Sequence, residues 1–321
     1  MNLDVYVFNA FKTKATNTAE SGNYLISGKG TESTKQNTNE VTSDRNSTGP
    51  VTTSNTTNSS YQGTESTKQR VTVSQISTAK PPSTTSNNTN SSYQEKSPCL
   101  SKEGVAIVVP YRNREEHLRV FIEEIVPFIQ RQNISFHIFI IEQSQKAGFN
   151  RAKLFNIGFK ESKSVGNFSC FIFHDVDLIP TSPDNYYCCE SNPKHMSVGN
   201  EKFNFKLPYG DYVGGVLAMT TESFLKTNGF SNAYFGWGGE DDDMNVRIKS
   251  AGLKTVRPSI IVGRYKALRH VQAVPGQDRF KLVETAKQRI TSDGIYTLNY
   301  TLLAKNTDGL TTHIKADIDA T

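Results

Sequence analysis

A largely apolar run from Phe168 to Phe173 leads directly into two carboxylates, Asp175 and Asp177, and this junction strongly constrains the fold. Such a run predicts a strand buried on both faces, as in a mainly parallel sheet. In open α/β sheets, ligands bind in the crevice beyond the carboxyl ends of the strands. Two oxygen donors there suit a divalent cation, and a cation there suits a diphosphate. A solvated turn is the alternative interpretation, because Asp and Pro are common turn residues.

Two earlier apolar runs, Val105–Pro110 and Phe136–Ile141, predict further strands of the same sheet. After each of them, apolar residues recur at helical spacing, which predicts helices over Glu115–Gln132 and Gly148–Glu161. Strand, helix, strand, helix, strand is the order of a doubly wound half that binds nucleotides. Later in the chain we expect helices at Thr221–Asn228 and Glu240–Ser250, and strands at Ser259–Gly263, Ile295–Leu303 and Thr311–Asp317.

Three arginines, Arg112, Arg114 and Arg151, follow predicted strands or open a predicted helix. A diphosphate would lie at these positions, and guanidinium forks match phosphate oxygens. The alternative is that they are solvated surface charges.

The N-terminal third has a different composition from the rest of the chain. From about Thr13 to Ser97 it is dominated by Ser, Thr, Asn, Gln and Lys, which lowers the hydrophobic fraction of the 321-residue chain to 36%. Such a stretch buries too little apolar surface to offset its ordering entropy. We therefore predict a disordered stem over residues 1–97 and one folded domain over residues 98–321. Several Asn-x-Ser/Thr sequons fit a stem in the secretory pathway.

The overall charge and the N-terminus exclude some classes of protein. The net charge is +5, without a basic stripe that interleaves aromatic residues, so nucleic-acid binding is not predicted. The first residues, 1–11, are too short and polar for a signal peptide or a transmembrane helix. Any membrane attachment would therefore need an N-terminal anchor that this sequence does not show.

The segment Tyr234–Asp243 contains the single tryptophan, Trp237, flanked by glycines and followed by four acids. A planar indole suits the apolar face of a sugar, one carboxylate could act as a base, and the glycines would let the segment move as a lid. The alternative is structural, because acids in the first turn of a helix are favoured by the helix dipole.

Four cysteines occur, at Cys99, Cys170, Cys188 and Cys189, without a Cys-x-x-Cys zinc pattern. A disulfide from Cys170 to Cys188 or Cys189 would enclose the two aspartates and would need an oxidising compartment. Four buried thiols are the alternative. A lone histidine such as His270 is ordinarily an unremarkable surface or core residue.

These motifs together resemble the animal β-1,4-galactosyltransferases, glycosyltransferase family 7, over roughly two thirds of the chain. The resemblance rests on Val109–Arg114, Phe149–Lys153, Asp175–Pro180, Gly236–Asp243 and Arg269–His270. It implies a GT-A fold, a Rossmann-like α/β domain that uses UDP-galactose and Mn²⁺, with Mg²⁺ as an alternative. It also implies transfer of galactose to O4 of a terminal GlcNAc with inversion, by a type II Golgi membrane protein whose catalytic domain is lumenal. A secreted form is expected if the anchor is truly absent.

The resemblance also implies roles for individual residues. Asp241 would be the catalytic base, with Glu240 beside it, and Asp177 and His270 would bind the metal. Cys170 would pair with Cys189, which leaves Cys188 over and Cys99 without an evident partner. The expected donor-binding residues are Pro110, Tyr111, Arg112, Arg114, Phe149, Arg151, Asp175, Val176, Asp177, Tyr212 and Trp237. The expected acceptor-binding residues are Gly238, Gly239, Glu240, Asp241, Asp242, Arg279 and Phe280, with Val283 nearby.

Two departures from the family pattern stand out. Ala267 replaces a methionine three residues before the metal histidine, and the segment between His270 and Arg279 is about three residues shorter than in the vertebrate enzymes. Tyr212 occupies a position that is bulky in galactosyl enzymes and smaller in N-acetylgalactosaminyl enzymes, which favours galactose as the donor sugar. The competing hypotheses are a UDP-GalNAc-using enzyme, a glycan-binding homologue that has lost catalysis, and a mucin-like stem protein whose folded part is merely structural.

Overall fold

The computed structural model describes residues 104–144 and 148–318, which lie in a compact unit spanning Asn87–Thr321. The predicted stem and its boundary at residue 98 lie outside the described residues. Within the described part of the chain, none of the helices is both long and apolar enough to span a membrane.

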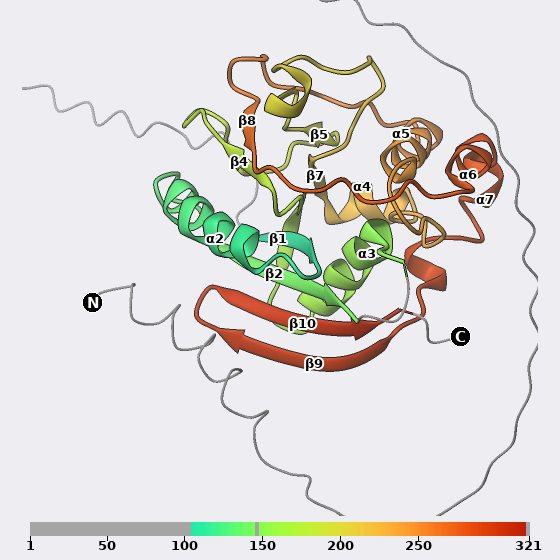
Figure 1. Ribbon diagram of the computed structural model, residues 1–321, viewed down its shortest axis with the longest axis horizontal. Helices are drawn as coiled ribbons and strands as arrows, with labels where there is room; N and C mark the ends of the chain where they lie inside the picture. The colour runs from blue at the N-terminus through green and yellow to red at the C-terminus, as the bar shows by residue number, and fades with distance from the viewer. Residues whose placement is uncertain (1–103, 145–147, 319–321) are drawn as a thin grey trace, which may run out of the picture. The chain divides into compact units, whose positions relative to one another are not determined.

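A seven-stranded mixed sheet forms the centre of the fold, in the order β5-β7-β3-β1-β2-β10-β9 (Figure 1). The strands β3, β1, β2 and β10 are parallel, whereas β7, β5 and β9 pair antiparallel with β3, β7 and β10. Their bounds are β1 Gly104–Tyr111, β2 Phe136–Gln143, β3 Phe168–His174, β5 Lys194–His195, β7 Val216–Thr220, β9 Thr301–Asp308 and β10 Thr311–Asp317.

Alternate residues of the central strands face two separate cores, which explains why these strands are apolar throughout. Ile107 pairs with Ile172 in the β1–β3 register and packs with Phe121 of helix α2, Glu115–Gln130. Val108 packs on the opposite face against helix α3, Arg151–Ser162. Figure 1 shows α2 and α3 on opposite sides of the sheet. The predicted doubly wound arrangement is therefore confirmed.

The remaining elements surround one end of this sheet. A second sheet has the order β4-β8-β6, with bounds β4 Leu178–Pro180, β8 Arg264–Ala267 and β6 Gly199–Asn200. The other helices are α4 Thr221–Lys226, α5 Glu240–Ser250, α6 Arg279–Glu284 and α7 Ala286–Arg289, with short 3₁₀ turns η2 Glu201–Phe203 and η3 Ile295–Thr297. In Figure 1, α5, α6 and α7 lie together.

Two of the predicted strands were wrong in position. The apolar segment Ser259–Gly263 forms turns, and β8 begins only at Arg264. The Ser259 carbonyl accepts a hydrogen bond from Gly263 N–H at 2.9 Å, which closes the turn. Ile261 is 69% exposed, so this short apolar run does not contribute to a core. The segment Ile295–Leu303 begins as the 3₁₀ turn η3, and its strand, β9, starts at Thr301.

The strand order determines where a ligand can bind. β1 lies between β3 and β2, so the connection from β1 to β2 through α2 and the connection from β2 to β3 through α3 run in opposite directions along the sheet and cover opposite faces. The carboxyl ends of β1 and β3 therefore border a topological switch point, where open α/β sheets bind their ligands. Arg112 and Arg114 follow β1 there, and Asp175 and Asp177 follow β3.

Candidate active site

Asp177 and His270, the expected metal ligands, meet at the end of β3. The Nε2 atom of His270 lies 2.7 Å from Oδ2 of Asp177, and Nη1 of Arg114 lies 3.6 Å from the same oxygen. The Leu268 N–H donates to the Asp177 carbonyl at 2.8 Å, which fixes the two segments side by side. Burial raises the pKa of Asp177, but the hydrogen bond from His270 and the charge of Arg114 outweigh it, so the net shift is downward. The hydrogen bond to Asp177 raises the pKa of His270.

Asp175 turns away from this pair and binds Arg151 at the start of α3. The Nε of Arg151 donates to Oδ1 of Asp175 at 2.5 Å, and its Nη1 lies 3.4 Å from Oε1 of Glu240. Burial raises the pKa of Asp175 to about 6, although the Arg151 charge opposes this. The other oxygen of Glu240, Oε2, is buried and has no hydrogen-bond partner among the described residues. Arg151 therefore links the strand-end carboxylates to helix α5, and Glu240 keeps one acceptor available.

Asp241, the expected base, sits in the first turn of α5 beside two other acids. Burial raises its pKa to about 7, and the neighbouring charges of Glu240 and Asp242 add to this effect. Its carboxylate lies against Gly214, as does the Tyr212 hydroxyl, because a Cβ placed on Gly214 would collide with both groups. The glycine at residue 214 thus provides the space in which Asp241, the expected base, and Tyr212, the expected donor-selecting residue, come together.

Tyr209, which the sequence analysis did not single out, is hydrogen-bonded to Asp242, the acid that follows Asp241. The hydroxyl of Tyr209 donates to Oδ1 of Asp242 at 2.6 Å. Tyr209 and Tyr212 pack edge to face at 5.4 Å, and Arg257 donates to the Tyr212 carbonyl at 3.0 Å. The Leu207–Tyr212 loop therefore presents two aromatic residues to the first turn of α5. No spacing rule could have found the Tyr209–Asp242 contact, because it joins positions far apart in the chain.

The loop around Trp237 has a backbone conformation that requires glycine at several positions. Gly236, Gly238 and Gly239 have φ angles of +88°, +99° and +93°, a region that other residues rarely adopt. The Trp237 N–H donates to the Val274 carbonyl at 3.0 Å, and the Trp237 carbonyl accepts from Gly276 N–H at 3.0 Å. The indole is 43% exposed. The tryptophan loop is thus paired with the segment that leads into α6.

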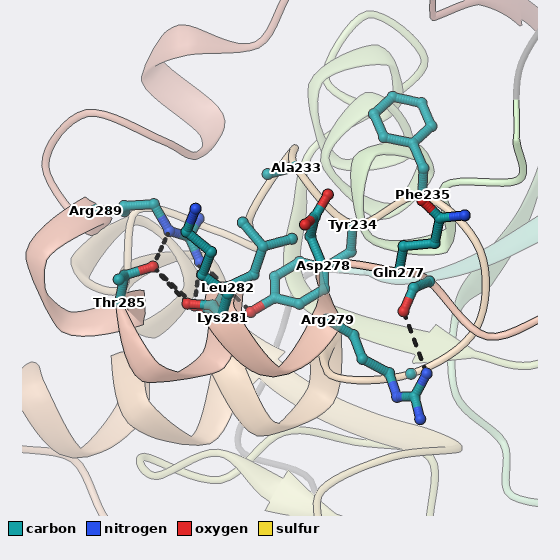
Figure 2. Close-up of a pocket in the computed structure, with 12 residues that line it drawn as sticks. Ala233, Tyr234, Phe235, Gln277, Asp278, Arg279, Lys281, Leu282, Thr285 and Arg289 are labelled. Carbon is teal, nitrogen blue, oxygen red and sulfur yellow. Dashed lines mark hydrogen bonds between the residues drawn. The ribbon is translucent and has the colours of Figure 1, made fainter.

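Between this loop and α6 lies a cavity of about 480 Å³ (Figure 2). Gly238 and Arg279, both expected to contact the acceptor, border it. Arg279 stacks on the Phe280 ring at 4.3 Å, and Phe280 is 68% exposed. Val283 packs toward Gly239. Part of the expected acceptor set therefore lies around the first turn of α6 and the end of the tryptophan loop, namely Gly238, Gly239, Arg279 and Phe280, whereas Glu240, Asp241 and Asp242 lie in the first turn of α5.

The remaining expected donor residues lie at the end of β1 and nearby. Tyr111 is buried, and Arg112 stacks over the Phe149 ring at 5.2 Å. Pro110 is buried within β1. The Val176 side chain is 5% exposed and belongs to the core beneath the site, so it is not available to contact a ligand.

The cysteines partly follow expectation. Cys170 and Cys189 form a disulfide with a Cα–Cα separation of 5.4 Å, as the family pattern implied. The expectation that Cys188 is left over was wrong, because Cys188 is also disulfide-bonded. Its partner lies outside the described residues, since the other two described cysteines are bonded to each other.

The chemistry of the Asp177–His270 pair fits a divalent metal. A carboxylate oxygen and an imidazole nitrogen, both partly exposed, are ligands that Mn²⁺ accepts. Within the described ranges, no cluster of three or more His, Cys, Asp or Glu side chains forms a fuller metal site. Ala267 adds no side-chain ligand, and its N–H is bonded to Glu201 at 3.0 Å. Among the described residues, Asp177 and His270 are therefore the two side chains that would hold a metal at this position.

Comparison with known families identifies two matching regions. Residues 54–190 match the N-terminal region of glycosyl transferase group 7, and residues 194–271 match a family described as the N-terminal domain of galactosyltransferase. The chain is 43% identical over 223 residues to β-1,4-galactosyltransferase 1 of Bos taurus and equally to that of Homo sapiens. Each match covers 68% of this chain and 56% of the relative, so the chain spans little more than half the length of these relatives.

Solved structures give a consistent result. The catalytic domain of Drosophila β-1,4-galactosyltransferase 7 in complex with xylobiose is 28% identical, with a TM-score of 0.60, and the match covers 68% of this chain and 95% of that one. A mutant of the same enzyme, in complex with manganese, UDP-Gal and xylobiose, is 29% identical, with a TM-score of 0.59 and the same coverage. The described residues thus have a GT-A type fold.

Proposed function

Because the chain belongs to glycosyl transferase group 7, the β-1,4-galactosyltransferase family, we propose that it transfers galactose from UDP-galactose to O4 of a terminal GlcNAc on a glycan. One observation carries this proposal: segments far apart in the sequence deliver the Asp177–His270 pair and Asp241 to the same edge of the sheet. A single displacement at a sugar diphosphate needs a cation near the diphosphate and a base near the attacking hydroxyl. Asp177 and His270 are candidate ligands for the cation, and Asp241, whose pKa is raised, is the candidate base.

The geometry assigns a role to each group. Arg114 lies beside Asp177, where it would pair with diphosphate oxygens. Asp241 would accept the proton of the attacking hydroxyl, and a pKa of about 7 keeps a large fraction of it ionised near neutral pH. Mn²⁺, when bound by Asp177 and His270, supplies a positive charge that stabilises the departing diphosphate. Attack from the side opposite the leaving group inverts the sugar centre, so no enzyme nucleophile is needed.

The partially buried tryptophan loop would exclude water from the donor sugar. Trp237 is joined to residues 274–276 by backbone hydrogen bonds, so the loop and the segment leading to α6 would move as one unit. Exclusion of water limits hydrolysis of the donor and strengthens the electrostatic interactions inside the site.

We also place this domain in the lumen of the Golgi, as a type II membrane protein or a secreted form. The Cys170–Cys189 disulfide supports an oxidising compartment.

The proposal is tested by measuring UDP release from UDP-galactose by the full chain, with and without acceptor. We expect release that depends on GlcNAc, is lost on treatment with EDTA, and returns when Mn²⁺ is added. A β-xyloside is tested in parallel, because the Drosophila relative was solved with xylobiose. Tight UDP binding without turnover, whichever metal is supplied, would instead indicate a glycan-binding homologue that has lost catalysis.

Donor choice gives a second prediction, at Tyr212. Its hydroxyl lies against Gly214 beside the base, and its ring packs edge to face on His195 at 5.5 Å. A fixed bulky ring there should crowd a 2-acetamido group on the donor sugar. We expect Tyr212→Ile to raise transfer of GalNAc by about tenfold, the scale of discrimination that pocket size provides. Transfer from radiolabelled UDP-GalNAc measures this.

The control for this prediction is Tyr296→Ile, at a tyrosine that is 72% exposed and lies outside the site. It should leave the ratio of GalNAc to galactose transfer unchanged. If Tyr212→Ile gives no gain in GalNAc transfer while it still transfers galactose, the steric explanation is incorrect.

A further inference from the structure

Helices α6 and α7 are not held in place by an apolar core. None of the residues of α6 is buried, and in α7 only Ala286 is. In proteins, short helices depend on tertiary packing of an apolar face for their stability. Yet α6 carries Arg279 and Phe280, which are expected to contact the acceptor. Beyond the contact of Val283 with Gly239, polar contacts should therefore contribute to fixing α6 against the rest of the site.

Arg289, the last residue of α7, makes such polar contacts with α6. Its Nη2 donates to the Leu282 carbonyl at 2.7 Å, and its Nε donates to the Thr285 hydroxyl at 3.3 Å. Figure 2 shows the Arg289 side chain directed back over the helix toward these two residues. One guanidinium thus binds both the backbone of α6 and the residue that ends it.

The same guanidinium also binds helix α5, which carries the proposed base Asp241. Its Nη2 donates to Oδ2 of Asp243 at 2.7 Å, and its Nη1 donates to Oδ2 of Asp293 at 2.5 Å. Asp243 is fully buried, and its Oδ2 also accepts from the Tyr234 hydroxyl at 3.0 Å. Tyr234 lies three residues before Trp237, and Asp243 lies two residues after Asp241. Arg289 therefore contacts α6, α5 and Tyr234, which precedes the tryptophan loop, at the same time.

We propose that Arg289 is a positioning residue that sets the acceptor helix α6 against the catalytic carboxylate on α5. A planar guanidinium presents several donors in a fixed geometry, so it can hold three elements in register where a lysine cannot. None of the contacts described for Arg289 in residues 104–144 and 148–318 involves the expected donor residues on β1, β3 or α3. The acceptor side of the site should therefore depend on Arg289, whereas the donor contacts made from β1, β3 and α3 should not. This inference rests on the proposed function.

The test compares Arg289→Met and Arg289→Lys with the native full chain in steady-state kinetics. For Arg289→Met we expect kcat/KM for GlcNAc to fall about tenfold, equivalent to about 1.4 kcal/mol. The KM for UDP-galactose should stay within about twofold, because none of the described contacts of Arg289 involves the expected donor residues of β1, β3 or α3. Arg289→Lys keeps the charge near Asp243 and Asp293 and should recover only part of the loss.

Lys287→Met, an exposed substitution on the same helix, is the matched control and should change nothing. Equal losses of kcat/KM for GlcNAc and for UDP-galactose would show a merely structural role and overturn the proposal, as would native kinetics in Arg289→Met. Hydrogen exchange tests the same contact without turnover. Amides of residues 279–285 should exchange faster in Arg289→Lys, while those of β1 and β3 should not, and unchanged exchange in α6 would also overturn the proposal. Absence of any turnover by the native chain would count against the proposed function, and the exchange result would still decide the role of Arg289.

Discussion

Replacing Asp241 by asparagine is expected to lower kcat by about 10³-fold, within the range attributed to a positioned general base. Asparagine has nearly the same size, so it should fit beside Gly214 and Tyr212, but it cannot take the proton of the acceptor hydroxyl. UDP binding should remain within about twofold of native, because Asp241 makes no described contact with Arg114, Asp177 or His270. Turnover by UDP release, together with calorimetric binding of UDP in the presence of Mn²⁺, measures the two effects separately.

The pH dependence gives this prediction a second readout. A base acts only when it is deprotonated, and the pKa of Asp241 is raised to about 7 by burial and by its acidic neighbours. Activity should therefore be low below pH 6, increase through pH 7, and level off above it. The residual activity of Asp241→Asn should lack this rise. Asp308→Asn, at the exposed last residue of β9, is the matched control and should keep the native profile. A rise retained in Asp241→Asn would show that another group is the base.

Periodicity predicted the central sheet well, for an identifiable reason. Strands such as Val105–Pro110 are buried on both faces, so every residue must be apolar and the run stands out from its surroundings. Helix Glu240–Ser250 was also confirmed with its bounds, because four acids in a first turn mark a helix N-terminus. The ends of such elements then located the candidate ligands, since side chains that follow neighbouring parallel strands meet at one edge.

Elements that depend on distant partners were less predictable. Ser259–Gly263 has the composition of a strand, but its backbone closes a local turn and Ile261 faces solvent. The strands β5 and β6, at Lys194–His195 and Gly199–Asn200, are two residues each, so they carry no periodicity to detect. Their pairing depends on β7 and β8, which lie elsewhere in the chain.

The polar contacts of the site were the least accessible to sequence reasoning. The four acids of the Glu240–Asp243 run looked alike, yet three of them have different side-chain partners: Arg151 for Glu240, Tyr209 for Asp242, and Arg247 and Arg289 for Asp243. These partners lie on four different segments. The sequence indicates that four adjacent negative charges need positive or hydrogen-bonding partners. Only the folded chain shows that these side-chain partners bind the other three acids and leave Asp241 available as a base.

Breaking the ion pair of Arg247 should produce the largest loss of stability. Its side chain is completely buried, its Nε donates to Oδ1 of Asp243 at 2.5 Å, and its Nη1 donates to the Asp293 carbonyl at 2.7 Å. Removal of Arg247 leaves the buried Asp243 carboxylate with Arg289 as its remaining cation, and breaking a buried ion pair typically costs about 3–5 kcal/mol. For a domain of this size, we expect Arg247→Met to lower Tm by roughly 10 °C. Thermal unfolding followed by circular dichroism measures this.

A double variant separates the uncompensated charge from lost packing. If the buried Asp243 carboxylate causes the loss, then Arg247→Met combined with Asp243→Asn should be more stable than Arg247→Met alone, because the second change removes that charge. Lys249 lies on the same helix as Arg247 and forms an exposed ion pair with Asp211. Lys249→Met should barely change Tm, since water screens that pair. A double variant no more stable than Arg247→Met would show instead that packing around the arginine determines the loss. In that case Asp243 would matter chiefly through Arg289 and the acceptor helix, and Asp243→Asn alone should raise the KM for GlcNAc with little change in Tm.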